Sequence, residues 1–338
     1  MLSPDSTLTT FLVASGLARA EEEAKWTSLT GGVSSDIWRV QTATRDICIK
    51  RALPKLKVDA EWQAPVSRNA VEWDWYVFAA EHAPAAVPTP LAHDPEAGLF
   101  AMEFLVPEQY PLWKAQLLMG EINVGTAAAV GRVLVQLHNA SAVDSSVPAR
   151  FDTTINFHAL RLEPYLIATA VRHPALRVRL EEILQTTAST RRALVHGDVS
   201  PKNILVGPES PVLLDAECAW FGDPAFDLAF CANHLLLKCL VCPSRREQLL
   251  VAFDSLVHEY LDKVEWEPRP TLEARATALL PALLLARVDG KSPVEYLTDE
   301  RQKALVRSFA IPLIEVPEIS LSAVRSAWAR VLKQHISK

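Results

Sequence analysis

Apolar positions alternate with polar ones in short runs along the first third of the chain and recur at helical spacing along most of the rest. The short runs predict strands at residues 37–40, 46–50 and 99–105, and the first two form a hairpin across the loop 42–45. Helical spacing predicts helices at residues 7–24, 68–82, 126–141, within 160–188, and from 227 to the C-terminus with a break at 262–270. A strand-loop-strand segment at residues 194–215 interrupts the helices.

This order of elements predicts an α+β protein with two lobes. The small lobe, residues 1–105, combines an antiparallel sheet with a helix, and the large lobe, residues 106–338, is mainly helical. The hinge is expected near Glu103 to Pro107, where the last strand of the small lobe is broken. A length of 338 residues agrees with two domains.

Composition and charge fit an ordinary globular protein and narrow its partners. Apolar residues make up 49% of the chain and charged residues 22%, so a large core can form. The formal net charge of -6 argues against nucleic acid as a partner, and no apolar run reaches the ~18 residues of a membrane span. The N-terminus has no basic segment before its apolar residues, and five cysteines are an odd number for a disulfide framework. We therefore expect a cytoplasmic protein.

Four potential zinc ligands occur close together in the second half of the chain: Cys231, His234, Cys239 and Cys242. The surrounding residues 226–241 are almost all apolar, and cysteine is itself a common core residue. The pattern favours a buried helix over a metal site.

The segment from Leu194 to Leu205 contains the most informative spacing, because Asp198 is followed five residues later by Asn203. In a kinase catalytic loop, such an Asp meets the acceptor hydroxyl and such an Asn holds a metal ion on the nucleotide phosphates. The apolar run 212–214 predicts a short buried strand that delivers Asp215 and Glu217 to the same place. Oxygen ligands of this kind suit Mg²⁺, with Glu217 binding it directly or through water. The spacing predicts a phosphotransferase.

The small lobe supplies candidates for holding the nucleotide. Lys50 ends the second hairpin strand, where its ammonium group can reach the α- and β-phosphates, and Glu72 on the next helix is the expected ion-pair partner, ahead of Glu61 and Glu81. Backbone N–H groups of a turn-rich loop can cover the phosphates, because glycine lets the main chain approach closely. The loop residues are Gly31, Gly32, Val33, Ser34 and Ser35, and the last strand adds Met102, Glu103 and Leu105 as nucleotide contacts.

The acceptor hydroxyl is expected beside Asp198, which orients it and takes its proton. Lys202 either reaches the γ-phosphate or faces solvent. His196 is expected to order the loop by hydrogen bonds and Asp227 to brace it, while Trp220 is a candidate wall of the acceptor site.

These motifs resemble the aminoglycoside phosphotransferase and choline kinase superfamily. The resemblance rests on His196-Gly197-Asp198 with Asn203, and on Asp215 followed by Gly222-Asp223-Pro224 and Asp227-Leu228-Ala229. It covers most of residues 25–300. It implies a protein-kinase-like fold, ATP and Mg²⁺ as cofactors, and a hydroxyl of a small molecule as acceptor.

Within that superfamily the chain is most similar to 5-methylthioribose kinases. One similar segment is 215–222, in which Glu217 replaces the second Asp of other members. Another is 286–295, which resembles the region where those enzymes place two adjacent arginines against their sugar. Here Ala286 stands first and only Arg287 remains, as a candidate substrate contact. Asn203 is a second departure, because methylthioribose kinases typically lack it.

The acceptor is left open among a sugar, a sugar-like polyol, and an amino alcohol of the aminoglycoside, choline or homoserine type. A protein kinase is disfavoured, because the segment from Asp215 to Asp227 is too short for an activation loop. A nucleotide-binding pseudokinase is disfavoured, because Lys50, Asp198, Asn203 and Asp215 are all present. The superfamily includes dimers, which makes a homodimer one expectation.

Overall fold

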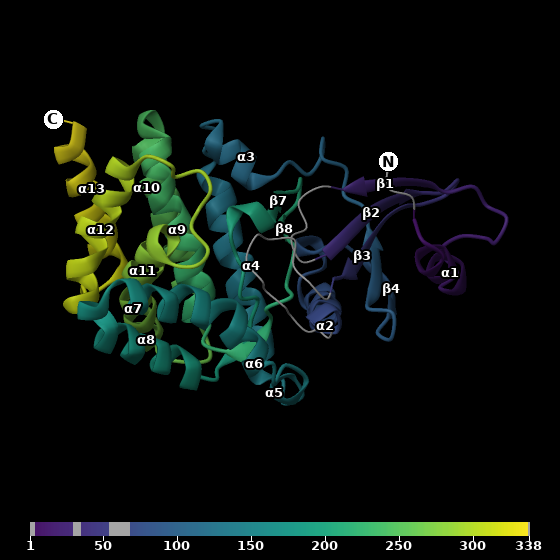
Figure 1. Cartoon of the computed structure of the whole chain (residues 1–338), viewed down its shortest axis with the longest axis horizontal. Helices are drawn as coiled ribbons and strands as arrows, with labels where there is room; N and C mark the ends of the chain where they lie inside the picture. The colour runs from purple at the N-terminus through teal and green to yellow at the C-terminus, as the bar shows by residue number, and fades with distance from the viewer. Residues whose placement is uncertain (1–3, 30–34, 54–67, 337–338) are drawn as a thin grey trace.

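The computed structural model describes residues 4–29, 35–53 and 68–336, and it has two lobes (Figure 1). Within these residues the small lobe contains a five-stranded antiparallel sheet in the order β1-β2-β3-β5-β4. The strands are β1 (Lys25–Leu29), β2 (Ser35–Gln41), β3 (Asp46–Ala52), β4 (Pro90–Asp94) and β5 (Leu99–Glu103). A mainly helical lobe follows, so the predicted α+β class is confirmed.

Both faces of the sheet are covered at the central strand β3, so its side chains point toward one covering element or the other. Two helices flank the sheet, α1 (Ser6–Ala14) and α2 (Arg68–His82). Helix α1 packs Phe11 into the apolar cluster that contains Ile49, and α2 packs Tyr76 into the cluster that contains Cys48. Because side chains alternate along a strand, Lys50 lies on the same side as Cys48 and points toward α2.

One expectation about the small lobe is corrected, and two of its strands were not predicted. The helix expected at residues 7–24 ends at Ala14, because Gly16 takes a left-handed backbone conformation with φ 70°. The strands β1 and β4 lie at the two edges of the sheet and were not predicted from the sequence pattern. Strand β4 begins with Pro90, and β1 leaves three of its five side chains exposed, so neither shows a strong apolar alternation.

The large lobe contains the helices that periodicity predicts. Helix α9 (Ala225–Val241) is buried along nearly its whole length, which confirms the buried helix predicted for residues 226–241. Helix α4 (Val124–Val143) packs against α10 (Arg246–Leu261). The other helices are α3 (Trp113–Leu118), α5 (Val147–Arg150), α6 (Thr154–Phe157), the π-helical η2 (His158–Ile167), α7 (Ala168–Arg172), α8 (Arg177–Ser189), α11 (Arg269–Asp289), α12 (Glu300–Glu315) and α13 (Leu321–Ile336), with short 3-10 turns at Pro84–Ala86, Pro174–Leu176, Pro201–Asn203 and Pro243–Arg245.

Two pairs of short strands bring the chemically important loops together. Strand β6 (Ala193–Val195) pairs with β9 (Trp220–Gly222), and β7 (Ile204–Val206) pairs with β8 (Pro211–Leu213). The loop 196–203 runs from β6 to β7, and the loop 214–219 runs from β8 to β9. Since each loop connects the same two strand pairs, the loops lie side by side.

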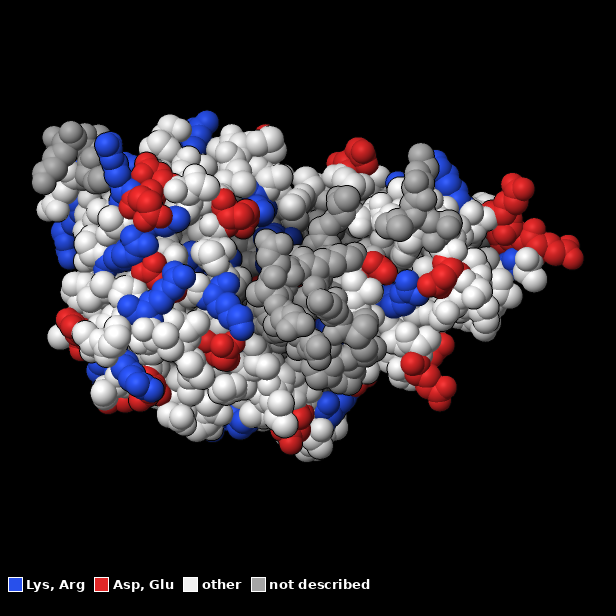
Figure 2. All heavy atoms as spheres, viewed as in Figure 1, with Lys and Arg blue, Asp and Glu red and all other residues white. Residues whose placement is uncertain are grey.

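The surface carries mixed charge. Lysine and arginine side chains are interspersed with aspartate and glutamate over the face of the helical lobe that Figure 2 shows. Among the described helices, none combines the length and the apolar character that crossing a membrane requires.

Candidate active site

Lys50 connects the two lobes through two carboxylates. Its side chain is 4% exposed on β3, and its Nζ lies 2.7 Å from Glu72 Oε1 on α2 and 2.5 Å from Asp215 Oδ1 in the loop after β8. Burial lowers the pKa of Lys50, but the carboxylates of Asp215 and Glu72 outweigh burial and raise it well above its ordinary value. Lys50 is therefore a fixed positive charge, and Glu72, rather than Glu81, is its partner on α2.

Asp215 is held in an unusual backbone conformation at the end of β8. Its φ of 67° lies in the left-handed region, which Asp tolerates better than most residues, and its N–H donates to the hydroxyl of Tyr76 at 3.0 Å. Burial alone would raise the pKa of Asp215, but the ammonium groups of Lys50 and Lys202 lower it well below its ordinary value. Asp215 therefore presents an ionised carboxylate toward Lys50.

Glu217 lies beside Asp215 and is tied to both lobes. Its Oε2 accepts from Nε of Arg68 at 3.0 Å, and its backbone carbonyl accepts from Nδ2 of Asn156 at 2.8 Å. Arg68, at the start of α2, also donates to the carbonyl of Leu53 at 2.6 Å. These contacts orient the loop 214–219 against the small lobe.

The catalytic-loop candidate is braced from α9. Both oxygens of the Asp227 carboxylate accept backbone hydrogen bonds, from His196 N at 2.7 Å and from Gly197 N at 2.9 Å. Gly197 has φ 81°, and a Cβ added there would lie 2.8 Å from the carbonyl oxygen of Cys218. The Asp198 N–H donates to Nδ1 of His196 at 3.2 Å. Asp227 and His196 thus contact the loop in the positions expected for bracing and ordering residues.

Asp198 is a buried carboxylate between two cations. Its Oδ2 lies 3.0 Å from Nη2 of Arg161 on η2 and 3.1 Å from Nζ of Lys202. Burial would raise the pKa of Asp198, but Arg161 and Lys202 outweigh it and lower the pKa. Asp198 is therefore ionised at neutral pH. Lys202 has a side chain that is 49% exposed, and its Nζ contacts Asp198; whether it reaches the γ-phosphate stays a prediction.

Asn203 completes the set of oxygen donors. Its Nδ2 donates to the backbone carbonyl of Asp198 at 3.1 Å, and its own carbonyl accepts from the N–H of Leu214 at 2.8 Å. The latter bond places Asn203 next to Asp215. Within the described part of the chain, Oδ1 of Asn203 and the second carboxylate oxygen of Asp215 accept no hydrogen bond.

This donor set fits Mg²⁺. The described residues contain no cluster of three His, Cys, Asp or Glu side chains that could hold a metal by themselves. Two carboxylates and one amide oxygen suit an ion that keeps several positions for water and phosphate. Glu72, Asp215 and Glu217 also bring three carboxylates close together, and a divalent cation can neutralise part of their charge.

Not every predicted nucleotide contact can be placed. Gly31, Gly32, Val33 and Ser34 lie outside the described residues, and Ser35 begins β2 with a buried side chain. At the end of β5, Met102 is buried, and the Glu103 side chain accepts a hydrogen bond from the hydroxyl of Thr89 at 2.9 Å. The N–H of Leu105 has no hydrogen-bond partner among the residues described, so it is available to a bound base.

Trp220 is not brought to the candidate site as a substrate contact. Its side chain is 1% exposed, its ring stacks on Phe157 with centroids 4.3 Å apart, and its Nε1 donates to Thr154 at 3.1 Å. All of these contacts belong to the core of the helical lobe. The expectation that Trp220 walls the acceptor site is therefore corrected to a packing role.

Arg287 lies beside the same aromatic ring, Phe230, as Arg161, the ion-pair partner of Asp198. Its guanidinium on α11 is buried and donates from Nη1 to the hydroxyl of Tyr165 at 2.8 Å and to the carbonyl of Ser292 at 2.6 Å. The Cζ atoms of Arg287 and Arg161 each lie 6.0 Å from the centroid of the Phe230 ring. The structure thus places Arg287 near the catalytic loop without contact to Asp198.

Sequence reasoning missed Arg161 and Tyr76. Arg161 lies 37 residues before Asp198 inside an unremarked helical stretch, and Tyr76 is one of several aromatic residues on α2. No local motif connects either residue to the catalytic loop, so only their tertiary contacts reveal them.

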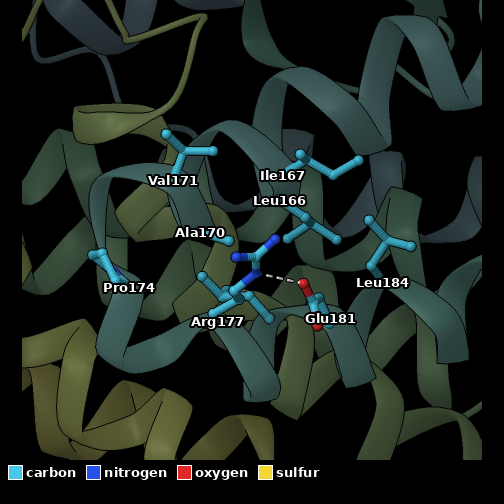
Figure 3. Close-up of a pocket in the computed structure, with 9 residues that line it drawn as sticks. Leu166, Ile167, Ala170, Val171, Pro174, Arg177, Glu181 and Leu184 are labelled. Carbon is cyan, nitrogen blue, oxygen red and sulfur yellow. Dashed lines mark hydrogen bonds and ion pairs between the residues drawn. The ribbon is translucent and has the colours of Figure 1, made fainter.

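A separate hollow of ≈ 220 Å³ lies on the helical lobe among η2, α7 and α8 (Figure 3). Its walls are mostly apolar, with Leu166, Val171 and Leu184 among them, and its charged pair, Arg177 and Glu181, is hydrogen-bonded internally at 2.8 Å. None of the predicted site residues lines it, so it offers no chemistry of phosphoryl transfer.

Comparisons with known proteins show which proteins the chain is similar to. The chain is 27% identical over 245 residues to a methylthioribose kinase of Escherichia coli, an alignment that covers 64% of this chain and 58% of the relative. The chain therefore spans less than two thirds of the length of that relative.

Two solved structures share the fold, which confirms the kinase-like architecture. A choline/ethanolamine kinase family protein from Mesorhizobium loti matches with a TM-score of 0.56 at 16% identity, covering 96% of this chain and 98% of that one. An ethanolamine kinase of Plasmodium vivax matches with a TM-score of 0.57 at 14% identity, covering 91% and 88%. Residues 25–239, well over half of the chain, match the profile of the phosphotransferase enzyme family. The chain therefore belongs to the phosphotransferase enzyme family.

Proposed function

We propose that this protein is an ATP- and Mg²⁺-dependent kinase that phosphorylates a hydroxyl group of a small, sugar-like metabolite. One observation supports the proposal above all. Lys50, which binds Glu72 and Asp215, thereby contacts the loop that lies beside the loop holding Asp198 and Asn203. Phosphoryl transfer requires little covalent chemistry from the protein, so positioning and charge neutralisation by such a set are its main contributions.

Each residue has a defined part in the proposed reaction. Lys50 leaves Asp215 to donate to the α- and β-phosphates, while Asp215, Asn203 and Glu217 would hold Mg²⁺ directly or through water. When bound there, Mg²⁺ would supply positive charge to the phosphates. The acceptor oxygen forms a bond to the γ-phosphorus, the bond from that phosphorus to the β–γ bridging oxygen breaks, and ADP leaves with the electron pair.

Asp198 receives the hydroxyl proton. A carboxylate held ionised by Arg161 and Lys202 is a weak base, which suits a loose transition state in which the proton leaves late. Lys202 can move its ammonium group from Asp198 to the transferring phosphoryl group, because its side chain is half exposed and its Nζ already lies at the site.

The sugar-like acceptor is proposed from the relatives that are named methylthioribose kinase. The departures at Ala286 and Asn203 set this chain apart from that pattern, so the acceptor is expected to be related to methylthioribose rather than the same compound.

The test is ADP release with ATP, Mg²⁺ and a panel of polyols, sugars and amino alcohols. Asp198→Ala should reduce turnover on the best acceptor by ~10²–10⁴-fold while nucleotide affinity stays nearly constant. Asp152→Asn is a matched control, since Asp152 is exposed and its carboxylate accepts only from Thr154, at 3.2 Å. Near-full activity of Asp198→Ala would show that Asp198 is not the base. Nucleotide binding without ADP release on any acceptor would instead identify a pseudokinase.

A further inference from the structure

Two buried cations near the catalytic loop have no carboxylate partner. Lys238 on α9 is 1% exposed and Arg287 on α11 is 6% exposed. Across the described residues, no carboxylate lies within ion-pair distance of either side chain. The Lys238 ammonium group lies 3.9 Å from the centroid of the Tyr296 ring.

The contacts of Lys238 do not offset the burial of its charge. Burying an ammonium ion costs more free energy than a cation–π contact returns. Burial outweighs the nearby carboxylate of Glu295, which raises the pKa of Lys238, and lowers that pKa to about 8. A charge kept at a net cost to folding indicates a binding role for the residue.

Further unpaired groups lie beside these cations. Arg287 Nε and His234 Nε2 are buried and have no hydrogen-bond partner among the residues that the structure describes. His234 is 4% exposed, stands one helical turn before Lys238, and contacts the hydroxyl of Tyr296 through Nδ1 at 3.0 Å. Burial, and then the positive charges of Arg287, Lys238, Lys202 and Lys114, hold the pKa of His234 well below its ordinary value. Neutral His234 and the cations thus form one cluster.

The cluster continues to Asp198. Phe230 lies one turn before His234 on α9, and its ring is shared by Arg287 and by Arg161, which binds Asp198. Lys202 extends the same positive field from the catalytic loop. Carboxylates are few here: Asp198 is already paired, and Glu295 is bound to Lys114 at the exposed edge of the cluster.

We propose that Lys238 and Arg287 bind a negatively charged group of the acceptor, whose hydroxyl lies at Asp198. This inference rests on the proposed function and deepens it: the acceptor is an oxygen-rich small molecule with a phosphate or carboxylate group, and amino alcohols are rejected. A bound anion supplies the missing charge partner of Lys238 and accepts from the unpaired Nε of Arg287. Cationic acceptors meet uncompensated like charge at the same place.

The experiment compares acceptors in matched pairs by ADP release. Ribose is compared with ribose 5-phosphate, and glucose with gluconate, so that the two arms separate phosphate from carboxylate; choline and kanamycin serve as cationic acceptors. We expect the anionic member of at least one pair to have the higher kcat/KM. Lys238→Met should raise KM for that acceptor about 10-fold or more and change the value for its neutral partner little.

Stability separates a binding role from a structural one. Replacing an unpaired buried ammonium group by an apolar side chain of similar length should raise the urea midpoint. If Lys238 stabilised the core, its substitution would instead lower the urea midpoint. Arg287→Lys provides a second variant that keeps the charge but loses the unpaired Nε, and Lys263→Met removes a half-exposed lysine as a surface control.

The outcomes distinguish the two proposals. Preference for neutral or cationic acceptors, with ADP release that still requires Asp198, overturns the anionic acceptor and leaves the kinase assignment in place. If no acceptor releases ADP, the kinase assignment fails, and equilibrium binding of ribose 5-phosphate and gluconate to wild type and Lys238→Met decides the inference. Binding that is weakened by the substitution supports it, and equal or absent binding overturns it.

Discussion

Replacing Arg161 by methionine tests whether Asp198 depends on a buried cation. The guanidinium lies 3.0 Å from Asp198 Oδ2, and it also donates to the carbonyls of Gly197 and, at 2.7 Å, of Leu160. At an effective dielectric constant of about 20, unit charges at this distance interact by about 5 kcal/mol. Lys202 still contacts Asp198, but its exposed side chain is screened. We expect Arg161→Met to lose about 3 kcal/mol of stability at pH 7.5, at the low end for breaking a buried pair.

The pH dependence of that loss identifies its cause. In wild type the pKa of Asp198 is lowered, so its contribution to stability is present above the unfolded pKa and disappears as pH falls through the folded pKa. Without Arg161, burial dominates and the pKa of Asp198 rises. Protonation then removes the unpaired charge, so the stability difference between variant and wild type should shrink as pH falls from 7.5 to 5.

Urea unfolding at both pH values measures this difference, and the acid limb of the kcat/KM profile should move to higher pH in the variant. Arg177→Met is the control, because Arg177 forms an exposed pair with Glu181 and should cost less than about 0.5 kcal/mol at either pH. An equal stability loss at pH 5 and 7.5 would contradict the reasoning and assign Arg161 to packing alone.

Two further substitutions test the metal donors and the loop conformation. Asp215→Asn should abolish the Mg²⁺-dependent part of ADP affinity, measured by calorimetry with and without Mg²⁺; an unchanged difference would remove Asp215 from the metal site. Gly197→Ala should cost about 2 kcal/mol or more, because φ is 81° and the new Cβ meets the Cys218 carbonyl at 2.8 Å. Gly16→Ala isolates the backbone contribution, since φ is 70° and nothing lies within 4 Å of its Cβ. Equal urea midpoints of the two variants would mean that the contact with Cys218 carries no energy.

Local motifs could be predicted from the sequence, but contacts between distant segments could not. The Asp198–Asn203 spacing and the carboxylates after the strand 212–214 are local patterns, and the structure brings these residues together. Arg161 belongs to another helix, and its ion pair with Asp198 depends on how η2 packs, which no spacing records. Edge strands β1 and β4 were missed for a related reason, because a strand with one neighbour and exposed side chains has little apolar alternation.

Lys238 illustrates a different limit. In the sequence it interrupts an otherwise apolar helix, and such a lysine normally extends its ammonium group to solvent. The structure buries it instead, next to Tyr296 and beyond ion-pair distance of every carboxylate in the described chain. The binding role proposed for Lys238 rests on its lack of an ion-pair partner among the described residues. A sequence shows which charged residues are present, but it does not show which of them form ion pairs.

The two sides of the proposed site differ in charge, and the reaction explains why. On the nucleotide side, the carboxylates of Glu72, Asp215 and Glu217 lie close together, which favours a divalent metal. On the acceptor side, cations outnumber the carboxylates of Asp198 and Glu295. With the anionic acceptor proposed above, the phosphoryl group moves between two negatively charged molecules, and the protein has to offset their repulsion. Unpaired buried cations on the acceptor side meet that requirement, whereas for a neutral or cationic acceptor they would only cost stability.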